Sequence, residues 1–268
     1  MTTFLDKVVA ETRERLAERS GAPSLTELRG EAEACRFALD SFRLSDALSR
    51  KNRVNIIAEI KRASPSKDVI DPTAHAAERA VTYETSGAAA ISILTEPKYF
   101  RGSLDDIRDA RRSVDLPLLR KDFIADPIQI YEAAIAGADA VLLIVAALSE
   151  NDLQALLSTT ESLGLDALVE VHCRDELNTA VKVGAKVIGV NNRNLHSLEV
   201  DLSTSFNLAR HKPEGCLLVS ESGISSAEEI ERLSEAGFDG FLIGEALMTS
   251  GDPSKKLAAL AAAGGSHG

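Results

Sequence analysis

The sequence predicts an α/β protein built as a single (β/α)8 TIM barrel with an N-terminal helical extension. Eight short apolar runs recur along the chain after residue 54, and helical segments separate them. The runs are almost continuous in Val, Ile, Leu and Ala, as in parallel strands that are covered on both faces. Eight such units in about 210 residues match the size of this barrel. An open doubly wound sheet is the rival fold, but no Gly-x-Gly-x-x-Gly motif follows any of the runs.

Residues 1–50 are predicted to be helical and to pack on the barrel. Phe4, Leu5, Val8 and Val9 follow helical spacing, and residues 11–18 are rich in Arg and Glu, as on a solvated face. Gly, Ala, Pro and Ser at positions 21–24 interrupt this helix, and a shorter one follows over residues 25–37. No strand is predicted in this segment.

The barrel itself is predicted to cover residues 51–260. We expect its strands over residues 55–60, 88–94, 116–119, 138–145, 167–171, 187–190, 216–220 and 241–243. A glycine precedes five of them and suits the left-handed position that ends a helix. Helix starts are predicted at Pro72, Pro127 and Glu150, and within residues 225–229. Residues 261–268 are predicted to be a disordered tail.

Composition excludes several classes of function. The net charge of -11 and the absence of a basic stripe argue against binding to nucleic acid. The three cysteines have no Cys-x-x-Cys spacing, which indicates neither a disulfide framework nor a zinc cluster. The chain has no apolar signal core and no membrane-spanning run, so we expect a cytoplasmic protein without a membrane partner. The sequence leaves the oligomeric state open.

The carboxyl ends of the predicted strands carry an unusual set of polar residues. Glu59 and Lys61 are two residues apart and therefore share a face of the first strand. Alone, such a pair would usually be an ion pair at the rim. Charged or amide groups recur, however, at the ends of later strands: Lys121, Glu170, Asn191 and Glu221. Because barrel active sites lie at this end, the recurrence favours an enzyme that uses acid and base catalysis.

Two glycine turns favour a phosphate site. Gly223 follows the seventh predicted strand and Gly244 follows the eighth, where many barrels bind phosphate on backbone N–H groups. Ser64, after the first strand, could add a hydroxyl donor. His172 shares a face with Glu170 but has no second ligand at metal spacing, so no metal site is expected.

Five segments, taken together and in order, resemble the indole-3-glycerol phosphate synthase family. They are Ile-Ala-Glu-Ile-Lys-Arg-Ala-Ser-Pro-Ser (57–66), Leu-Arg-Lys-Asp-Phe (119–123), Leu-Val-Glu-Val-His (168–172), Gly-Val-Asn-Asn-Arg-Asn-Leu (189–195) and Ser-Glu-Ser-Gly-Ile (220–224). The resemblance covers almost the whole chain. One departure is Asp68, where the family usually has Gly.

The resemblance implies conversion of 1-(2-carboxyphenylamino)-1-deoxyribulose 5-phosphate to indole-3-glycerol phosphate, carbon dioxide and water, without a cofactor. It assigns Lys121 as the acid at the ribulose carbonyl and places Glu59, Lys61 and Glu170 at the dehydration, without deciding which of them is acid or base. Asn191 and Glu221 are implied near the substrate hydroxyls, with Arg193 and Ser222 in support. The implied phosphate positions are Ser64, Gly223 and Gly244. Phe100, Phe123 and Leu142 could form an apolar wall for the aromatic ring. Phe4 or Leu5 of the extension could also touch substrate or only shield the barrel.

Two other functions remain open from the sequence. One is another phosphosugar barrel enzyme, such as phosphoribosylanthranilate isomerase, which would share the glycine turns but would not need Glu59, Lys61 and Lys121 together. The other is a noncatalytic phosphosugar-binding barrel. The intact lysine and glutamate positions weigh against a binding protein that has lost its chemistry.

Overall fold

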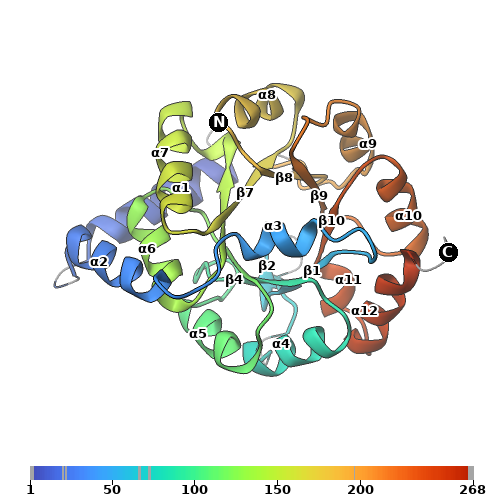
Figure 1. Cartoon of the computed structure of the whole chain (residues 1–268), viewed down its shortest axis with the longest axis horizontal. Coiled ribbons are helices and arrows are strands. Elements are labelled where there is room, and N and C mark those ends of the chain that lie inside the picture. Colours follow the sequence, from blue (N-terminus) through green and yellow to red (C-terminus); the bar gives the residue numbers. More distant parts are fainter. Residues whose placement is uncertain are drawn as a thin grey trace.

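The computed structural model describes residues 3–19, 21, 23–65, 68–71, 74–195 and 197–264. Eight parallel strands form a closed barrel, as predicted, in the order β1-β10-β9-β8-β7-β6-β5-β4 (Figure 1). β1 closes the ring by pairing with both β4 and β10. The strands are β1 (Ile56–Ile60), β4 (Ala90–Leu94), β5 (Leu118–Lys121), β6 (Ala140–Ile144), β7 (Asp166–Val171), β8 (Val187–Asn191), β9 (Leu217–Glu221) and β10 (Gly240–Ile243).

The barrel strands are buried on both faces, which explains their nearly continuous apolar sequences. Inward-facing residues such as Ile57, Leu119 and Leu168 fill the barrel interior. Outward-facing residues such as Ile91 and Val169 pack beneath the surrounding helices. A polar side chain at a strand end is therefore held by two packed layers, and its position is correspondingly fixed.

Helices connect the strands on the outside of the barrel. They are α4 (Ala76–Thr85), α5 (Leu104–Ser113), α6 (Pro127–Ala136), α7 (Glu150–Ser162), α8 (Arg174–Lys182), α9 (Ser203–Ala209), α10 (Ala227–Glu235), α11 (Glu245–Met248) and α12 (Pro253–Ala261), with 3-10 turns η1 (Val145–Ala147) and η2 (Ala262–Gly264). The starts of α6 and α10 follow their capping residues, Asp126 and Ser226. The five glycines expected at helix ends all have positive φ: Gly87, Gly137, Gly164, Gly184 and Gly237.

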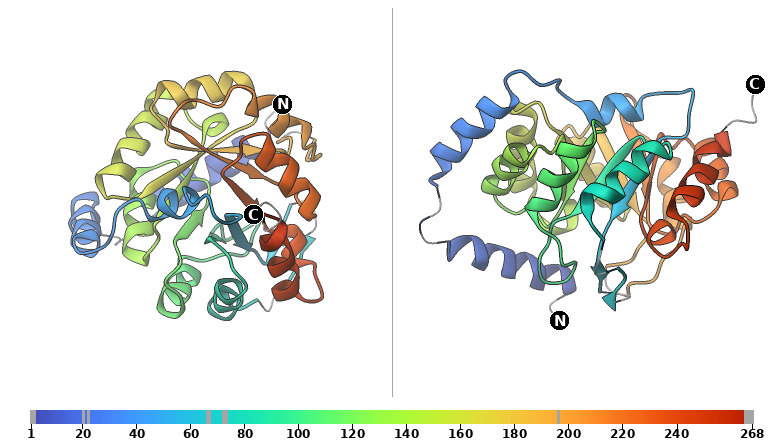
Figure 2. Two further views of the ribbon diagram at one scale, coloured as in Figure 1. Left: turned by 45° about the vertical axis from the view of Figure 1, so that its right-hand side comes forward. Right: turned by 90° about the horizontal axis from the view of Figure 1, so that it is seen from below.

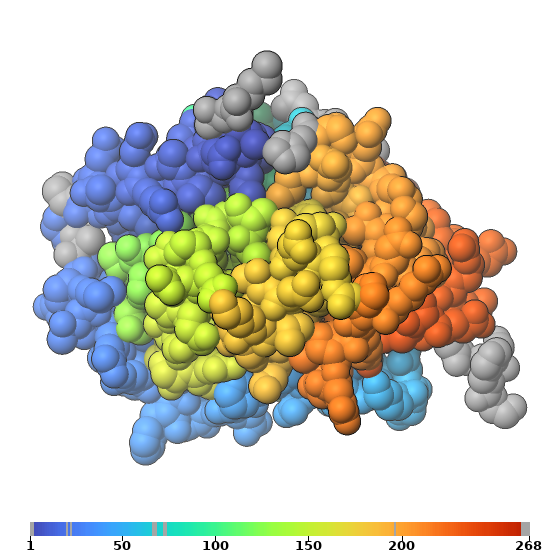
Figure 3. Space-filling view, turned by 90° about the horizontal axis from the view of Figure 1, so that it is seen from above, coloured from blue at the N-terminus to red at the C-terminus, as the bar shows by residue number. Residues whose placement is uncertain are grey.

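The N-terminal segment runs from one end of the barrel to the other. It forms α1 (Phe4–Ala17), α2 (Leu25–Arg36) and α3 (Arg43–Leu48). α1 and α3 lie at opposite ends, and α2 packs on α6 between them (Figure 2). Figure 3 shows the segment in blue along one side of the molecule. The sequence did not distinguish α3, whose fully buried Leu44 and Leu48 close the amino end of the barrel interior.

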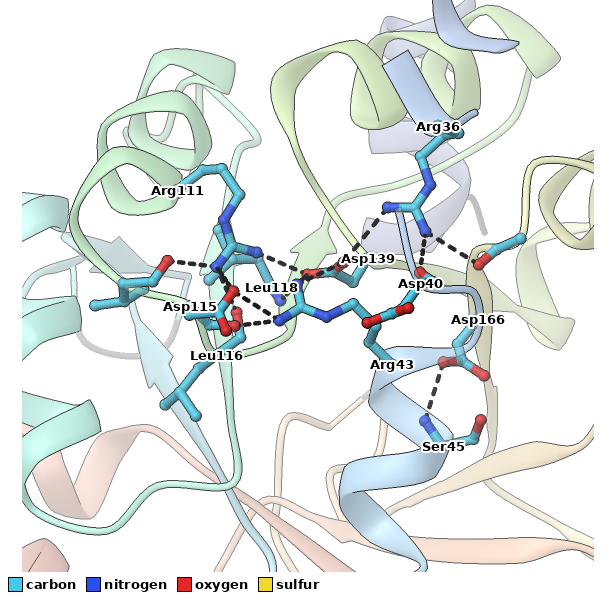
Figure 4. Close-up of polar contacts among 12 residues, drawn as sticks. Arg36, Asp40, Arg43, Ser45, Arg111, Asp115, Leu116, Leu118, Asp139 and Asp166 are labelled. Carbon is cyan, nitrogen blue, oxygen red and sulfur yellow. Dashed lines mark hydrogen bonds and ion pairs between the residues drawn. The ribbon is translucent and has the colours of Figure 1, made fainter. Parts of the chain in front are cut away.

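A buried carboxylate, Asp139, joins this segment to the barrel (Figure 4). Its oxygens lie 3.4 Å from Arg36 Nη1, 3.1 Å from Arg43 Nη1 and 2.9 Å from Arg111 Nη1. These arginines belong to α2, α3 and α5, and the Asp139 side chain is only 2% exposed. Asp139 also accepts a hydrogen bond from the backbone N–H of Leu118 in β5. We call these four charged residues the Asp139 cluster.

The chain after β1 forms a small antiparallel hairpin, β2 (Ala63–Ser64) with β3 (Asp68–Val69). The structure corrects one local prediction. The helix start predicted at Pro72 was wrong: α4 begins at Ala76, because the backbone of its N-cap residue, His75, is still extended. Pro72 itself lies outside the described residues, as do residues 265–268 of the predicted tail, whereas residues 261–264 end α12 and form η2.

No helix in the described part of the chain is long and apolar enough to cross a membrane. Cys35, Cys173 and Cys216 are free thiols.

Candidate active site

Two adjoining cavities lie at the carboxyl ends of the strands. The polar cavity has a volume of about 420 Å³ and includes the turns at Gly223 and Gly244. The apolar cavity has a volume of about 150 Å³ and includes Phe100, Phe123 and Leu142. They share five residues predicted for the site: Glu59, Lys61, Lys121, Arg193 and Ser222. Of the other predicted residues, Ser64, Glu170 and Asn191 line the apolar cavity, and Glu221 lies beneath Lys121.

A chain of alternating charges connects the two cavities. Lys61 Nζ lies 2.7 Å from Glu59 Oε1, and Lys121 Nζ lies 3.7 Å from Glu59 Oε2 and 2.6 Å from Glu221 Oε2. Glu59 thus stands between two ammonium groups, and Lys121 stands between two carboxylates. Their positions follow from the fold, since β1, β5 and β9 present these residues at the same end of the barrel.

Burial and charge act in opposite directions on these groups. Burial disfavours an ionised Glu59, but Lys61 and Lys121 outweigh it and keep the pKa of Glu59 below its usual value. Burial likewise disfavours a charged Lys121, yet Glu221, Glu59 and Glu170 raise the pKa of its ammonium group. Lys121 is therefore protonated near neutral pH and can act as a hydrogen-bond and proton donor.

Glu221 and Glu170 differ sharply in their proton affinity. Burial raises the pKa of Glu221 to about 7, although Lys121 opposes the shift. Its Oε1 is buried and has no hydrogen-bond partner among the described residues. Burial acts on Glu170 as well, but the nearby ring of His172, with Lys121 and Asn191, lowers the pKa of Glu170 to about 2. The site therefore contains a carboxylate that remains ionised and a carboxyl that titrates near neutrality.

Two glycines leave space for these carboxylates. A Cβ at Gly244 would lie 2.2 Å from Glu59 Oε1, and one at Gly189 would lie 2.0 Å from Glu221 Oε1. Both contacts are shorter than any non-bonded approach in proteins, so a larger residue would move the carboxylate. Gly244, which the sequence indicated for phosphate binding, thus also makes room for Glu59.

The polar cavity combines backbone turns with a cation. Residues 222–225 and 243–246 line it, and Arg193 extends into it from the loop after β8. Three contacts orient Arg193: its backbone N–H donates to Asn191 Oδ1 at 3.0 Å, its Nη1 donates to Leu198 O at 2.9 Å, and its Nη2 lies 3.5 Å from Oε2 of Glu245, which lines the same cavity. Ser222 adopts a left-handed conformation, with φ of 67°. Such strain in a non-glycine residue is common at functional sites.

The apolar cavity is enclosed by aromatic rings. The ring centroid of Phe123 lies 6.4 Å from that of Phe4 and 6.3 Å from that of Phe100. Buried Glu96 holds the loop of Phe100, since its carboxylate accepts the backbone N–H groups of Lys98, Tyr99 and Phe100. The walls are thus rigid enough to orient a planar ring.

The structure adds residues that the sequence left open or missed. Phe4 and Leu5 of α1 line the apolar cavity, so the extension forms part of its wall. Leu195 and Leu198 line it from the loop after β8, and no periodic pattern marks such loop residues. His172, considered in the sequence only as a metal ligand, instead contacts Glu170. Among the described residues, no three His, Cys, Asp or Glu side chains are grouped to hold a metal ion.

A larger cavity of about 780 Å³ lies at the amino end of the barrel, between residues 50–55 and α10. Two of its cations are paired with the same carboxylate: Lys51 and Lys212 lie 2.7 and 2.6 Å from Asp239. No residue from the carboxyl end of a strand lines it. The candidate active site is therefore the pair of cavities at the carboxyl end.

Comparison with solved structures supports the fold. The chain is similar to a 3-hexulose-6-phosphate synthase from Salmonella typhimurium, with a TM-score of 0.63 and 13% identity over 80% of this chain and 100% of that one. At this identity the likeness bears on the barrel alone.

Sequence comparison is more specific. The chain is 46% identical over 263 residues to an indole-3-glycerol phosphate synthase from Carboxydothermus hydrogenoformans, covering 97% of this chain and all of that one. It is 45% identical over 262 residues to the synthase from Rhodococcus opacus, covering 98% and 96% of the two chains. A family model for indole-3-glycerol phosphate synthase matches residues 5–260. The chain therefore belongs to the indole-3-glycerol phosphate synthase family, the carboxy-lyases of tryptophan biosynthesis.

Proposed function

We propose that the two cavities bind one molecule of 1-(2-carboxyphenylamino)-1-deoxyribulose 5-phosphate, with its phosphate in the polar cavity and its aromatic ring in the apolar cavity. The arrangement of charge supports this orientation. Arg193 and the turns at Gly223 and Gly244, which line the polar cavity, suit an anion, whereas Phe100, Phe123 and Leu142 of the apolar cavity suit a planar ring. The sugar chain then lies across Lys61 and Lys121, which line both cavities.

Ring closure requires an acid at the ribulose carbonyl, and Lys121 fills that role. Its ammonium group is charged and is held at 2.6 Å by Glu221. Donation to the carbonyl oxygen makes the carbonyl carbon electrophilic, and the ring carbon that bears the carboxylate attacks it. Loss of carbon dioxide then returns an electron pair to the ring. The Lys121–Glu221 contact is the observation that carries this proposal.

The final dehydration removes a hydroxyl group and a proton, which leave as water. Glu170 is the base, because its carboxylate is ionised and lines the same cavity as the aromatic wall. Lys61, held by Glu59 at 2.7 Å, supplies the second ammonium group and can protonate the departing hydroxyl. Asn191 helps to keep the pKa of Glu170 low. Glu59 lies between the two lysines and contributes to the raised pKa of Lys121.

The alternative functions from the sequence fit the site less well. A noncatalytic phosphosugar-binding barrel needs the polar cavity and Arg193 but has no use for a buried Lys121 surrounded by three carboxylates. An isomerase such as phosphoribosylanthranilate isomerase needs one acid and one base, whereas this site brings together two lysines and three glutamates. The number of ionisable groups thus favours a reaction with several proton transfers.

The test is turnover of the purified protein on 1-(2-carboxyphenylamino)-1-deoxyribulose 5-phosphate, followed by the fluorescence of the indole product. We expect indole-3-glycerol phosphate without added metal or cofactor. Phosphoribosylanthranilate, the substrate of the alternative isomerase, is assayed in parallel. Turnover of that compound alone, or binding without turnover of either compound, would contradict the proposed function.

A further inference from the structure

His172 lies between two carboxylates at the edge of the proposed active site. Its Nε2 is 3.2 Å from Glu170 Oε1, and its Nδ1 is 3.1 Å from Glu176 Oε2. The imidazole side chain is 14% exposed. The same ring thus contacts the proposed base, Glu170, on one side and Glu176, which lines neither cavity, on the other.

Glu176 fixes the position of this ring. It is the third residue of α8, the helix that follows β7. The N-cap residue of α8, Cys173, makes no side-chain capping bond. Instead, Glu176 Oε2 accepts the backbone N–H of His172 at 2.7 Å as well as contacting the ring. One carboxylate oxygen therefore anchors both the backbone and the imidazole of His172.

The surroundings favour a positively charged ring. Burial opposes the imidazolium form, but Glu170 from β7 and Glu176 from α8 together raise the pKa of His172 to about 10. Glu170 in turn faces Lys121 of β5 and Asn191 of β8. The 3-10 turn η1, which also packs on α8, consists of Val145 and two alanines and adds no charge.

The contact with Glu170 is electrostatic rather than a directed hydrogen bond. Nε2 of His172 is buried and makes no aligned hydrogen bond among the described residues, although Glu170 Oε1 is 3.2 Å away. The charge of the ring, rather than one linear N–H···O contact, therefore holds the Glu170 carboxylate. Such an interaction is strong where water is excluded.

We propose that His172 is a positioning residue for the reaction: anchored by Glu176, it acts as a fixed imidazolium that keeps Glu170 ionised and directed at the substrate. This inference rests on the role of Glu170 as the base in the proposed function. His172 itself transfers no proton. It acts only through Glu170, and Glu176 acts only through His172.

The first test measures the charge of the ring directly, by the ¹⁵N chemical shifts of the histidine side chains over a range of pH. The chain has five histidines, and the His172→Gln variant identifies the signal of His172 by its loss. We expect His172 to remain an imidazolium at pH 8.5. The Glu176→Gln variant should lower its titration midpoint by about one pH unit or more, because one of two carboxylates is lost. A neutral ring at pH 8 in the unaltered protein would overturn the proposal.

The second test uses the pH dependence of kcat/KM for His172→Gln. Without the imidazolium, burial raises the pKa of Glu170, so the base becomes protonated in mildly acidic solution. The ratio of variant to unaltered kcat/KM should decrease about tenfold between pH 7 and pH 5. Asp175→Asn is the matched control, because it removes an exposed acid from the same first turn of α8 and should leave the ratio constant.

The outcomes separate this proposal from the proposed function. A ratio that is equally low at every pH would mean that His172 only supports packing, and would overturn the inference alone. A Glu170→Gln variant that keeps nearly full activity would remove Glu170 from the reaction and the positioning role of His172 with it. Loss of activity in Glu170→Gln together with a pH-dependent ratio in His172→Gln would support both.

Discussion

The two ends of the barrel each carry a cluster of buried charges, but the clusters differ in balance and in space. At the amino end, three arginines surround Asp139, which also accepts a backbone N–H (Figure 4). At the carboxyl end, Lys121 contacts Glu59 and Glu221, and Glu221 Oε1 has no hydrogen-bond partner among the described residues. Two cavities adjoin the second cluster.

This difference distinguishes the Asp139 cluster, which holds the fold together, from the charges at the carboxyl end, for which we propose a role in the reaction. In the Asp139 cluster, the arginines cannot lose their protons near neutral pH, and they join α2, α3 and α5 around one carboxylate. At the carboxyl end, the pKa of Glu59 is lowered and that of Lys121 is raised, but the pKa of Glu221 rises to about 7, where it can gain or lose a proton near neutral pH. A buried charged cluster therefore indicates catalysis only when its members titrate and when substrate can reach them.

The largest effect is expected on stability, from Asp139→Ala. Removing the shared carboxylate leaves three arginines without their common partner, which should cost about 3–5 kcal/mol of the free energy of unfolding. Denaturation in urea would measure the loss. Turnover per folded molecule should stay within about twofold, and a larger fall would mean that the two ends of the barrel are coupled.

Lys121→Ala should have the opposite effect, a loss of activity without a loss of folding. Loss of the proposed acid should lower kcat at least about 100-fold, as expected for a positioned general acid, while circular dichroism shows a folded protein. Lys255→Ala is the control, because Lys255 is 87% exposed and lies far along the chain in α12. Near-normal turnover of the Lys121 variant would exclude this residue from the mechanism.

Glu221→Gln tests whether the carboxyl of Glu221, whose Oε1 has no hydrogen-bond partner among the described residues, titrates. The folded-state pKa of Glu221 lies above its unfolded value of 4.5, at about 7. Between these values the folded protein binds a proton that the unfolded chain releases, so this group makes the protein less stable as pH rises from about 4.5 to about 7. The variant should lose that decrease and any inflection near pH 7 in kcat/KM, with activity reduced about tenfold or more. Parallel stability curves for both proteins would argue against a titrating Glu221.

Gly244→Ala should have the smallest effect, about tenfold on activity. The backbone permits alanine, since φ is -122°, but the new Cβ would lie 2.2 Å from Glu59 Oε1. A fall in kcat would indicate a displaced Glu59, whereas a rise in KM alone would indicate only a weaker phosphate site. Gly251→Ala is the control, because the added Cβ would have no atom within 4 Å apart from its own residue and its chain neighbours.

The sequence by itself determined the barrel and the residues at its strand ends. Apolar runs, glycines at helix ends and capping residues are local signals, because each depends on burial or backbone conformation within a few residues. They placed all eight barrel strands, and the strand ends brought Glu59, Lys121 and Glu170 together as candidates. The motifs added the family, which the comparisons confirm.

Only the tertiary structure decided how those candidates interact. The pairing of Lys121 with Glu221 joins residues 100 positions apart, and that of His172 with Glu170 depends on the side-chain orientation set by Glu176 in α8. The course of α3 to the amino end of the barrel likewise depends on the contact of Arg43 with distant Asp139, and that of α1 to the carboxyl end depends on contacts such as Glu11 with Lys98. The pKa shifts of these groups depend on burial and on every nearby charge, so they arise only when the chain is folded.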